Sequence, residues 1–148
     1  MSITVTVADV AALVPEATIP EERETGQKAV IESEVEDWIA SLTATVTLQC
    51  DGWTRLPAER LDVFEQVAQT IVACGAASYL EAARAPERAG MADTSYAGVL
   101  WERWREGLTG LQAIVREWLM DPEPGGSLSL LGGAASFPDP SIPDNPAW

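Results

Sequence analysis

The chain has 148 residues, with 23 acidic side chains against 9 basic ones, no histidine and a formal net charge of −14. This balance argues against a protein that wraps nucleic acid, because phosphate binding is driven by Lys and Arg. The absence of histidine removes the commonest general base and metal ligand. At 47% hydrophobic and 22% charged residues, the composition is globular, and the length favours one domain, or one domain with an appendage.

The two cysteines, Cys50 and Cys74, belong to no metal-binding or redox motif. We expect reduced thiols that pack as small apolar residues, although the sequence leaves a disulfide between them open. Residues 1–5 lack the basic region and long apolar run of a signal peptide. The charge-free segment 66–80 contains polar residues and is too short for a membrane span. We therefore expect a chain that is made in the cytoplasm and does not bind a membrane.

The first residues predict little regular structure. Residues 3–7 alternate between apolar and β-branched polar side chains, which predicts a short strand. Asp9 is expected to open a turn or two of helix that Pro15 stops. Residues 15–27 contain two prolines, a glycine and four glutamates, and therefore indicate an exposed connection.

The first long helix is predicted over residues 27–43, followed by a break. The β-branched stretch 43–48 is compatible with a continued helix or a strand, and we favour irregular or strand structure there. Asp51-Gly52 indicates a turn. The apolar stripe of the helix comprises Ile31, Val35, Trp38, Ile39 and Leu42.

A central helix is predicted from Pro57, which suits a first helical position, to about Ala85. Small residues between positions 73 and 78 indicate that neighbouring helices approach it closely. Its main apolar stripe comprises Leu61, Phe64, Ala68, Ile71, Gly75, Ser78, Tyr79 and Ala82, and a second stripe comprises Val63, Val67 and Cys74.

Residues 86–95 indicate a polar loop that ends in possible helix caps. Helical periodicity then runs from Tyr96 to Trp118, and we expect Gly107 and Gly110 to divide it into two helices, ending at about Glu106 and Met120. The predicted fold class is mainly α, a small four- to five-helix bundle with a short N-terminal strand.

The composition changes at Asp121, which divides the chain into a helical body, 1–120, and a C-terminal segment, 121–148. This segment holds six of the ten prolines and four of the eleven glycines, which cannot sustain a helix. It has four acids and no base, leaving −14 + 4 = −10 for the body. We weigh a disordered terminus against an extended arm that orders on a partner. The arm's recurring apolar residues are Leu128, Leu130, Leu131, Phe137, Ile142 and Trp148.

No catalytic, metal or cofactor motif stands out, and we predict that the protein is not an enzyme and holds no cofactor or metal. Glu32, Glu36 and Asp37 cluster on the first long helix, but a solvated helix face explains them more simply than a carboxylate site. No acidic loop has the calcium-binding pattern, and neither Gly-Gly pair has the context of a phosphate loop.

The order and lengths of these elements carry a resemblance that covers residues 1–120. The segments are Ala-Asp-Val-Ala-Ala-Leu-Val-Pro (8–15), Ile-Glu-Ser-Glu-Val-Glu-Asp-Trp-Ile (31–39), Ala-Ala-Ser-Tyr-Leu (76–80) and Ser-Tyr-Ala-Gly-Val-Leu-Trp (95–101). Together they resemble the head-tail connector adaptor proteins of long-tailed bacteriophages with an HK97-type head. The end of the chain, with Phe137-Pro-Asp-Pro and Ala147-Trp148, is similar to adaptors from phages of actinobacteria.

The resemblance implies a structural protein of the virion neck, assembled in the host cytoplasm. It implies a dodecameric ring beneath the portal protein, with a stopper or tail completion protein below and a channel that passes DNA without sequence-specific binding. It also implies that the C-terminal arm grips the portal through its apolar residues. Glu32, Glu36 and Asp37 are candidates to face the channel.

The contact between protomers would need apolar and aromatic groups, for which Trp38, Trp53, Trp101, Trp104 and Trp118 are candidates, alongside a role in the core. Arg103 and Arg105 alternate with glutamates. These charges could form local ion pairs within the helix or fix the register of an interface between protomers. We take Trp101, Trp104, Arg103 and Arg105 as the candidate protomer interface.

Two other classes of function stay open. The acidic bias over residues 16–37 is also typical of a DNA-mimic protein that binds a basic nuclease or repressor, without forming a ring. An enzyme that uses carboxylates alone would depend on Glu32, Glu36 and Asp37.

Overall fold

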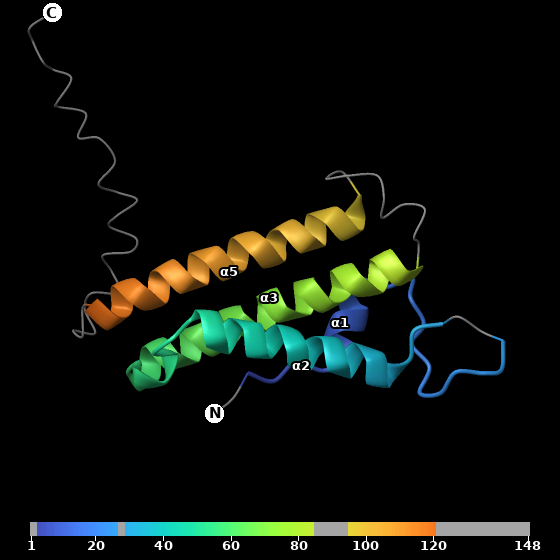
Figure 1. Cartoon of the computed structure of the whole chain (residues 1–148), viewed down its shortest axis with the longest axis horizontal. Coiled ribbons are helices and arrows are strands. Elements are labelled where there is room, and N and C mark those ends of the chain that lie inside the picture. Colours follow the sequence, from blue (N-terminus) through green and yellow to red (C-terminus); the bar gives the residue numbers. More distant parts are fainter. Residues whose placement is uncertain (1–2, 27–28, 85–94, 121–148) are drawn as a thin grey trace, which may run out of the picture.

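The computed structural model describes residues 3–26, 29–84 and 95–120 (Figure 1). The predicted arm at 121–148 and all but the last residue of the polar loop at 86–95 lie outside these ranges. Within them the chain is mainly helical, as predicted. The elements are α1 (Val7–Leu13), α2 (Glu32–Gln49), the short 3-10 helix η1 (Trp53–Arg55), α3 (Ala58–Arg84) and α5 (Tyr96–Met120).

The strand predicted for residues 3–7 is wrong, since residues 3–6 form no strand and Val7 begins α1. Thr6 caps this helix: its hydroxyl accepts from the Asp9 backbone N–H at 3.2 Å, and its own N–H donates to the Asp9 carboxylate at 2.8 Å. The Thr6 N–H and the Thr6 hydroxyl, which donates to the carboxylate at 2.9 Å, together lower the pKa of Asp9. A reciprocal cap satisfies two backbone donors locally, whereas a lone strand would leave its backbone groups unpaired.

Helix α2 begins at Glu32, later than predicted, and continues to Gln49 through the stretch 43–48. The prediction of irregular or strand structure there is therefore wrong. Val46 is fully buried and extends the stripe of Val35, Ile39 and Leu42 by one more turn. The Thr45 and Thr47 hydroxyls donate to backbone carbonyls within the helix, each at 3.0 Å, so burial outweighs the modest helix-propensity cost of β-branched residues.

The first turn of α2 is fixed by Glu34. Its carboxylate accepts from the Ile31 backbone N–H at 3.0 Å and from the Arg23 guanidinium at 2.7 Å. The hydrogen bond from Arg23, followed by that from Ile31, lowers the pKa of Glu34. The connection at 15–26 is thereby tied to α2, as it is by the Pro20 carbonyl, which accepts from the Glu32 N–H at 3.0 Å. Glu21 to Gly26 are all exposed, as predicted.

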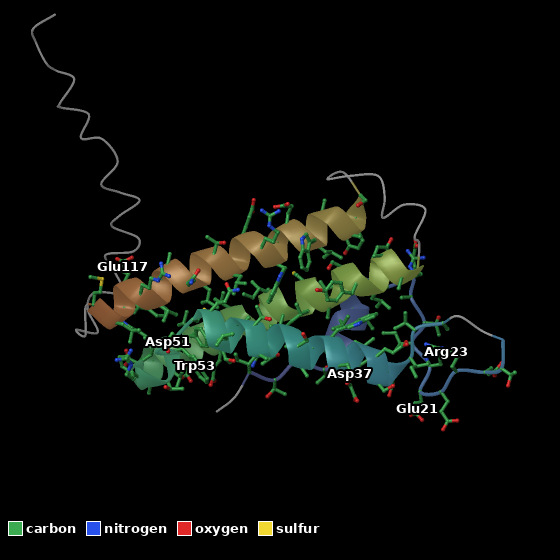
Figure 2. All side chains as sticks on the ribbon, viewed as in Figure 1. Glu21, Arg23, Asp37, Asp51, Trp53 and Glu117 are labelled. Atoms are coloured by element: carbon green, nitrogen blue, oxygen red, sulfur yellow. The ribbon has the colours of Figure 1, made fainter. Side chains whose placement is uncertain are left out.

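A tight turn joins α2 to α3, as Asp51-Gly52 predicted. Gly52 has a φ of +87°, a conformation that favours glycine. The turn leads into η1, where the ring of Trp53 stacks on Phe64 with 5.1 Å between ring centroids. Helix α3 then begins at Ala58, one residue after Pro57. Figure 2 shows Asp51 and Trp53 at the same end of the bundle as Glu117 of α5.

Helix α3 is the centre of the molecule, as predicted. In Figure 1, α2 and α5 lie on opposite sides of α3 and both run antiparallel to it, while α1 packs against α3 and α2. Every residue from Ile71 to Ser78 is buried. The second predicted stripe is partly wrong: Cys74 is buried, but Val63 and Val67 are 47% and 39% exposed.

The final helix is continuous from Tyr96 to Met120, so the predicted break at Gly107 and Gly110 is wrong. The Ser95 hydroxyl accepts from the Gly98 N–H at 2.9 Å and caps the helix. A Cβ built at Gly107 would come within 2.3 Å of Ile71 Cγ2. This glycine therefore permits the close packing of α5 on α3 and does not end a helix.

Both cysteines are buried and free, which agrees with the predicted reduced thiols. Burial raises the pKa of the Cys50 thiol to about 11 and also raises that of Cys74. Over the described ranges, none of the helices combines the length and apolar character that a bilayer crossing requires.

Candidate interaction surface

Three partly exposed aromatic rings, one from each long helix, form a row across the bundle. Tyr79 of α3 lies between Trp38 of α2, at 5.7 Å between ring centroids, and Trp101 of α5, at 5.6 Å. Tyr79 is 37% exposed, and both tryptophans are half-buried. We call Trp38, Tyr79 and Trp101 the aromatic row.

Gly75, one turn before Tyr79, explains why the three helices meet here. A Cβ at Gly75 would lie 2.9 Å from Leu42 of α2 and 3.2 Å from Trp104 of α5. The missing side chain lets α2 and α5 bring these two residues together over the axis of α3. The aromatic row lies about one turn away from this packed layer along the bundle, since Trp38 and Trp101 precede Leu42 and Trp104 by about one turn.

A groove of about 230 Å³ lies between α3 and α5 beside the aromatic row. The Ser78 hydroxyl donates to the Gly75 carbonyl at 2.6 Å, so its hydrogen bond is satisfied by the helix itself. The remaining side chains that line the groove are small or aromatic. The lining residues are Ser78, Tyr79, Ala82, Ala97, Gly98 and Trp101.

Val63 and Val67 form a second exposed apolar surface, which we call the valine patch. They lie one turn apart on α3. Val63 precedes Tyr79 by 16 residues, which is about 24 Å along the helix and about 160° around it. The valine patch and the aromatic row therefore occupy different faces and different ends of α3.

The candidate interface residues divide between surface and core. Trp101 lies in the aromatic row, whereas Trp104 is only 4% exposed and belongs to the hydrophobic core, so its assignment to a protomer interface is corrected. Arg105 pairs with Glu102 at 3.0 Å within α5, which is the local ion pair that the spacing predicted. Arg103 is exposed on the same helix.

The three candidate acidic residues do not form a convergent site. Glu36 and Asp37 are exposed on α2, whereas Glu32 is half-buried in its first turn. In Figure 2, Asp37 lies toward the same end of the molecule as Glu21 and Arg23. This arrangement is that of a solvated acidic surface.

Two buried charged residues of α3, Arg60 and Glu81, take part in contacts that hold other segments to this helix. Arg60 is 3% exposed; it donates to the Trp118 carbonyl at 3.2 Å, near the end of α5, and its guanidinium lies 5.7 Å from the Trp118 ring centre. Arg84 bonds Glu81 at 2.9 Å and Glu16 at 3.3 Å beside a hollow of about 300 Å³. These contacts fasten the last turn of α5 and the segment after α1 to α3.

Sequence reasoning missed Tyr79 as a surface residue, as it did Val63 and Val67, because all three fall within apolar stripes of α3. The phenol ring of Tyr79, with a polar tip, is a weak signal of a half-exposed position. Among the described residues, no group of three or more His, Cys, Asp or Glu side chains could hold a metal ion. Comparison with protein-family models, curated proteins and solved structures finds no match to this chain.

Proposed function

We propose that the protein is a structural virion component, a head-to-tail adaptor that forms a ring between the portal and the stopper or tail completion proteins of a long-tailed phage. The observation that carries the proposal is the pair of separate apolar surfaces, the aromatic row and the valine patch. A head-to-tail ring needs two different patches on each copy, one for each neighbour.

The charge of the chain fits a collar around DNA. Twelve copies at a formal −14 each would concentrate a charge of about −170, before screening by counterions. Exposed acids such as Glu36 and Asp37 would repel phosphates in a channel. The same charge opposes ring closure, so apolar contacts must supply most of the association.

The experiment images the full chain mixed with portal rings of the same phage by negative-stain electron microscopy. We expect a collar of about twelve copies on each portal. Val67→Glu should abolish the collar because it places a charge in the valine patch. Gln66→Glu is the matched control, since it adds a charge at the neighbouring exposed position and leaves the patch intact. Solitary copies in the wild-type mixture would contradict the proposal.

The C-terminal segment is proposed to hold the portal through Leu128, Leu130, Leu131, Phe137, Ile142 and Trp148. Trp148→Ala in the full chain should weaken attachment to the portal, because a large aromatic anchor contributes much of the energy of an interface. Asp144→Asn serves as a control in the same segment. Equal attachment of both variants would remove Trp148 from the proposed contact.

The acidic surface near the start of α2 favours one alternative, a DNA mimic. Exposed Glu21 and Asp37 lie toward one end of the molecule (Figure 2), and Glu36, next to Asp37 in the sequence, is also exposed. A mimic would bind a basic nuclease or repressor in a salt-sensitive way and would form no ring. Recovery of a basic protein in a pull-down from infected cells, without portal or tail components, would favour this alternative.

A further inference from the structure

We propose that the groove beside the aromatic row binds the proline-rich segment 137–146 of the same chain. The inference concerns the free chain and does not depend on its being an adaptor. It rests on the chemistry of the groove, the spacing of the prolines and the length of chain that joins the two.

The prolines of this segment have the period of a polyproline II helix. Pro140, Pro143 and Pro146 recur every three residues, and a polyproline II helix has three residues per turn, so all three rings would lie along one edge. Phe137 precedes Pro140 by the same spacing and would extend that edge. A proline-rich strand of this kind docks in grooves with aromatic walls.

The groove offers the two features that such a ligand needs. One side is formed by the rings of Tyr79 and Trp101, which pack against each other with 5.6 Å between centroids and a 35° tilt, and the rest by small residues of α3 and α5. Within the described part of the chain, the Tyr79 hydroxyl and the Trp101 indole N–H make no hydrogen bond. Both are donors, and a polyproline II backbone presents carbonyls that have no internal partner.

One basic residue near the groove is opposite in charge to the segment. Arg105 lies one turn after Trp101, on the same side of α5. The proline-rich segment carries Asp139 and Asp144 and no basic residue. Arg105 already forms an ion pair with Glu102 in the same helix. It would therefore help to orient the bound segment and would supply little of the binding energy.

The length of the connecting chain favours the same molecule over a second copy. Trp101 and Met120 are 19 residues apart, about 28 Å along α5. The 16 residues from Asp121 to Ser136, which join α5 to the docked segment, are rich in Gly and Ser in their middle, and a chain of that length and composition spans about 22 Å on average. A tether whose mean span matches the separation of the two sites gives the highest effective concentration.

If the proposed ring is correct, this docking would cover one of the two apolar surfaces before assembly. A free chain with both surfaces exposed would associate head to tail without control. Engagement of the arm by the portal would then release the aromatic row for a neighbouring copy.

The test is paramagnetic relaxation enhancement on the full chain labelled with ¹⁵N. A nitroxide is attached through Ala147→Cys, just outside the proline pattern. The native thiols are buried with raised pKa values, and the unsubstituted chain serves as the control for labelling. We expect the Ala97 and Gly98 amides and the Trp101 indole to lose most of their intensity. A nitroxide at Ser127→Cys should instead broaden the end of α5.

The decisive variant replaces Pro140, Pro143 and Pro146 with alanine in the Ala147→Cys background, which leaves length and charge unchanged. Selective broadening should then disappear. Persistence of the broadening, or uniform weak broadening in the parent, would overturn the proposal.

A second sample mixes nitroxide-labelled ¹⁴N chain with unlabelled ¹⁵N chain. Undiminished signals are expected, because the contact is intramolecular, whereas broadening in this sample would identify a second copy as the occupant and overturn the assignment. Neither experiment includes a portal. A negative result would therefore overturn the docking of segment 137–146 without affecting the proposed ring, and failure to observe the ring would not affect the docking.

Discussion

The two faces of α5 hold glycines with opposite surroundings. Gly107 faces α3, where an added Cβ would come within 2.3 Å of Ile71 Cγ2, whereas an added Cβ at Gly110 would meet nothing within 4 Å. Both glycines weaken a helix by a similar intrinsic amount. Only at Gly107 is this cost offset, because the missing side chain allows the backbones of α5 and α3 to approach each other. A glycine inside a helical pattern therefore indicates close packing or mere tolerance, and only its neighbours distinguish the two.

The same division runs along the whole helix. The inner face is buried and the outer face carries Arg103, Arg105 and Glu106 in solvent. Substitutions on the inner face should therefore cost far more than those on the outer face, and four variants test how sharp this division is. The buried residues of the inner face are Ala97, Leu100, Trp104, Leu108, Leu111, Val115 and Trp118.

Trp104→Ala should have the largest effect, lowering the free energy of unfolding by about 3–5 kcal/mol. The buried indole fills the space over Gly75 and contacts Trp101 in the aromatic row. Urea denaturation followed by circular dichroism measures the loss. Trp104→Phe should retain part of the stability, and a loss below about 1 kcal/mol for the alanine variant would contradict a core role.

Gly107→Ala should lower the free energy of unfolding by about 1–3 kcal/mol, because the new methyl group overpacks the contact with Ile71. Ile71→Ala provides the control. In the double variant the methyl group enters the space that the isoleucine leaves, so the combined loss should be smaller than the sum of the two single losses. Additive losses in urea denaturation would show that the clash is relieved elsewhere.

Gly110→Ala should raise the free energy of unfolding by about 0.5–1 kcal/mol, since alanine has the higher helix propensity and the added methyl group meets no neighbour. The opposite signs at positions 107 and 110 are the sharpest form of the comparison. Thermal and urea unfolding of both variants measure it. Destabilisation at Gly110 would mean that the outer face is also packed.

Glu102→Gln should change the free energy of unfolding least, by no more than about 0.5 kcal/mol. Its partner, Arg105, is 62% exposed, and the pair lies within one helix. The small loss should fall further at high salt, which screens exposed charges. Denaturation at low and high ionic strength checks this, and a loss that is large at both would indicate a structural role for the pair.

The long helices could be predicted because their patterns are strong. The stripe of α3 and the run of small residues at 73–78 required a central helix, and the structure buries every residue from Ile71 to Ser78. The polar connection before α2, the turn at Gly52 and the free cysteines also follow from local signals. Local rules failed where two of them competed, as at Thr6, where a helix cap prevailed over strand alternation.

The candidate surface was less predictable. Trp101 and Trp104 are three residues apart and equally aromatic, yet one lies at the surface and the other in the core. Helical periodicity places both on one side of α5, but it does not determine which of the two side chains a neighbouring helix buries. For the same reason the periodicity of α3 predicts a core position for Val63 and Val67, which the neighbouring helices leave exposed.

The sequence by itself determined that the chain would be helical, acidic and centred on α3, because hydrophobic period, charge and small residues act within a few turns of their own helix. Tertiary structure alone decided which glycine is packed, which tryptophan is buried and that 43–48 stays helical. Those outcomes depend on how α2 and α5 approach α3 from either side, and the distance between helices is a property of pairs of faces that no single segment encodes.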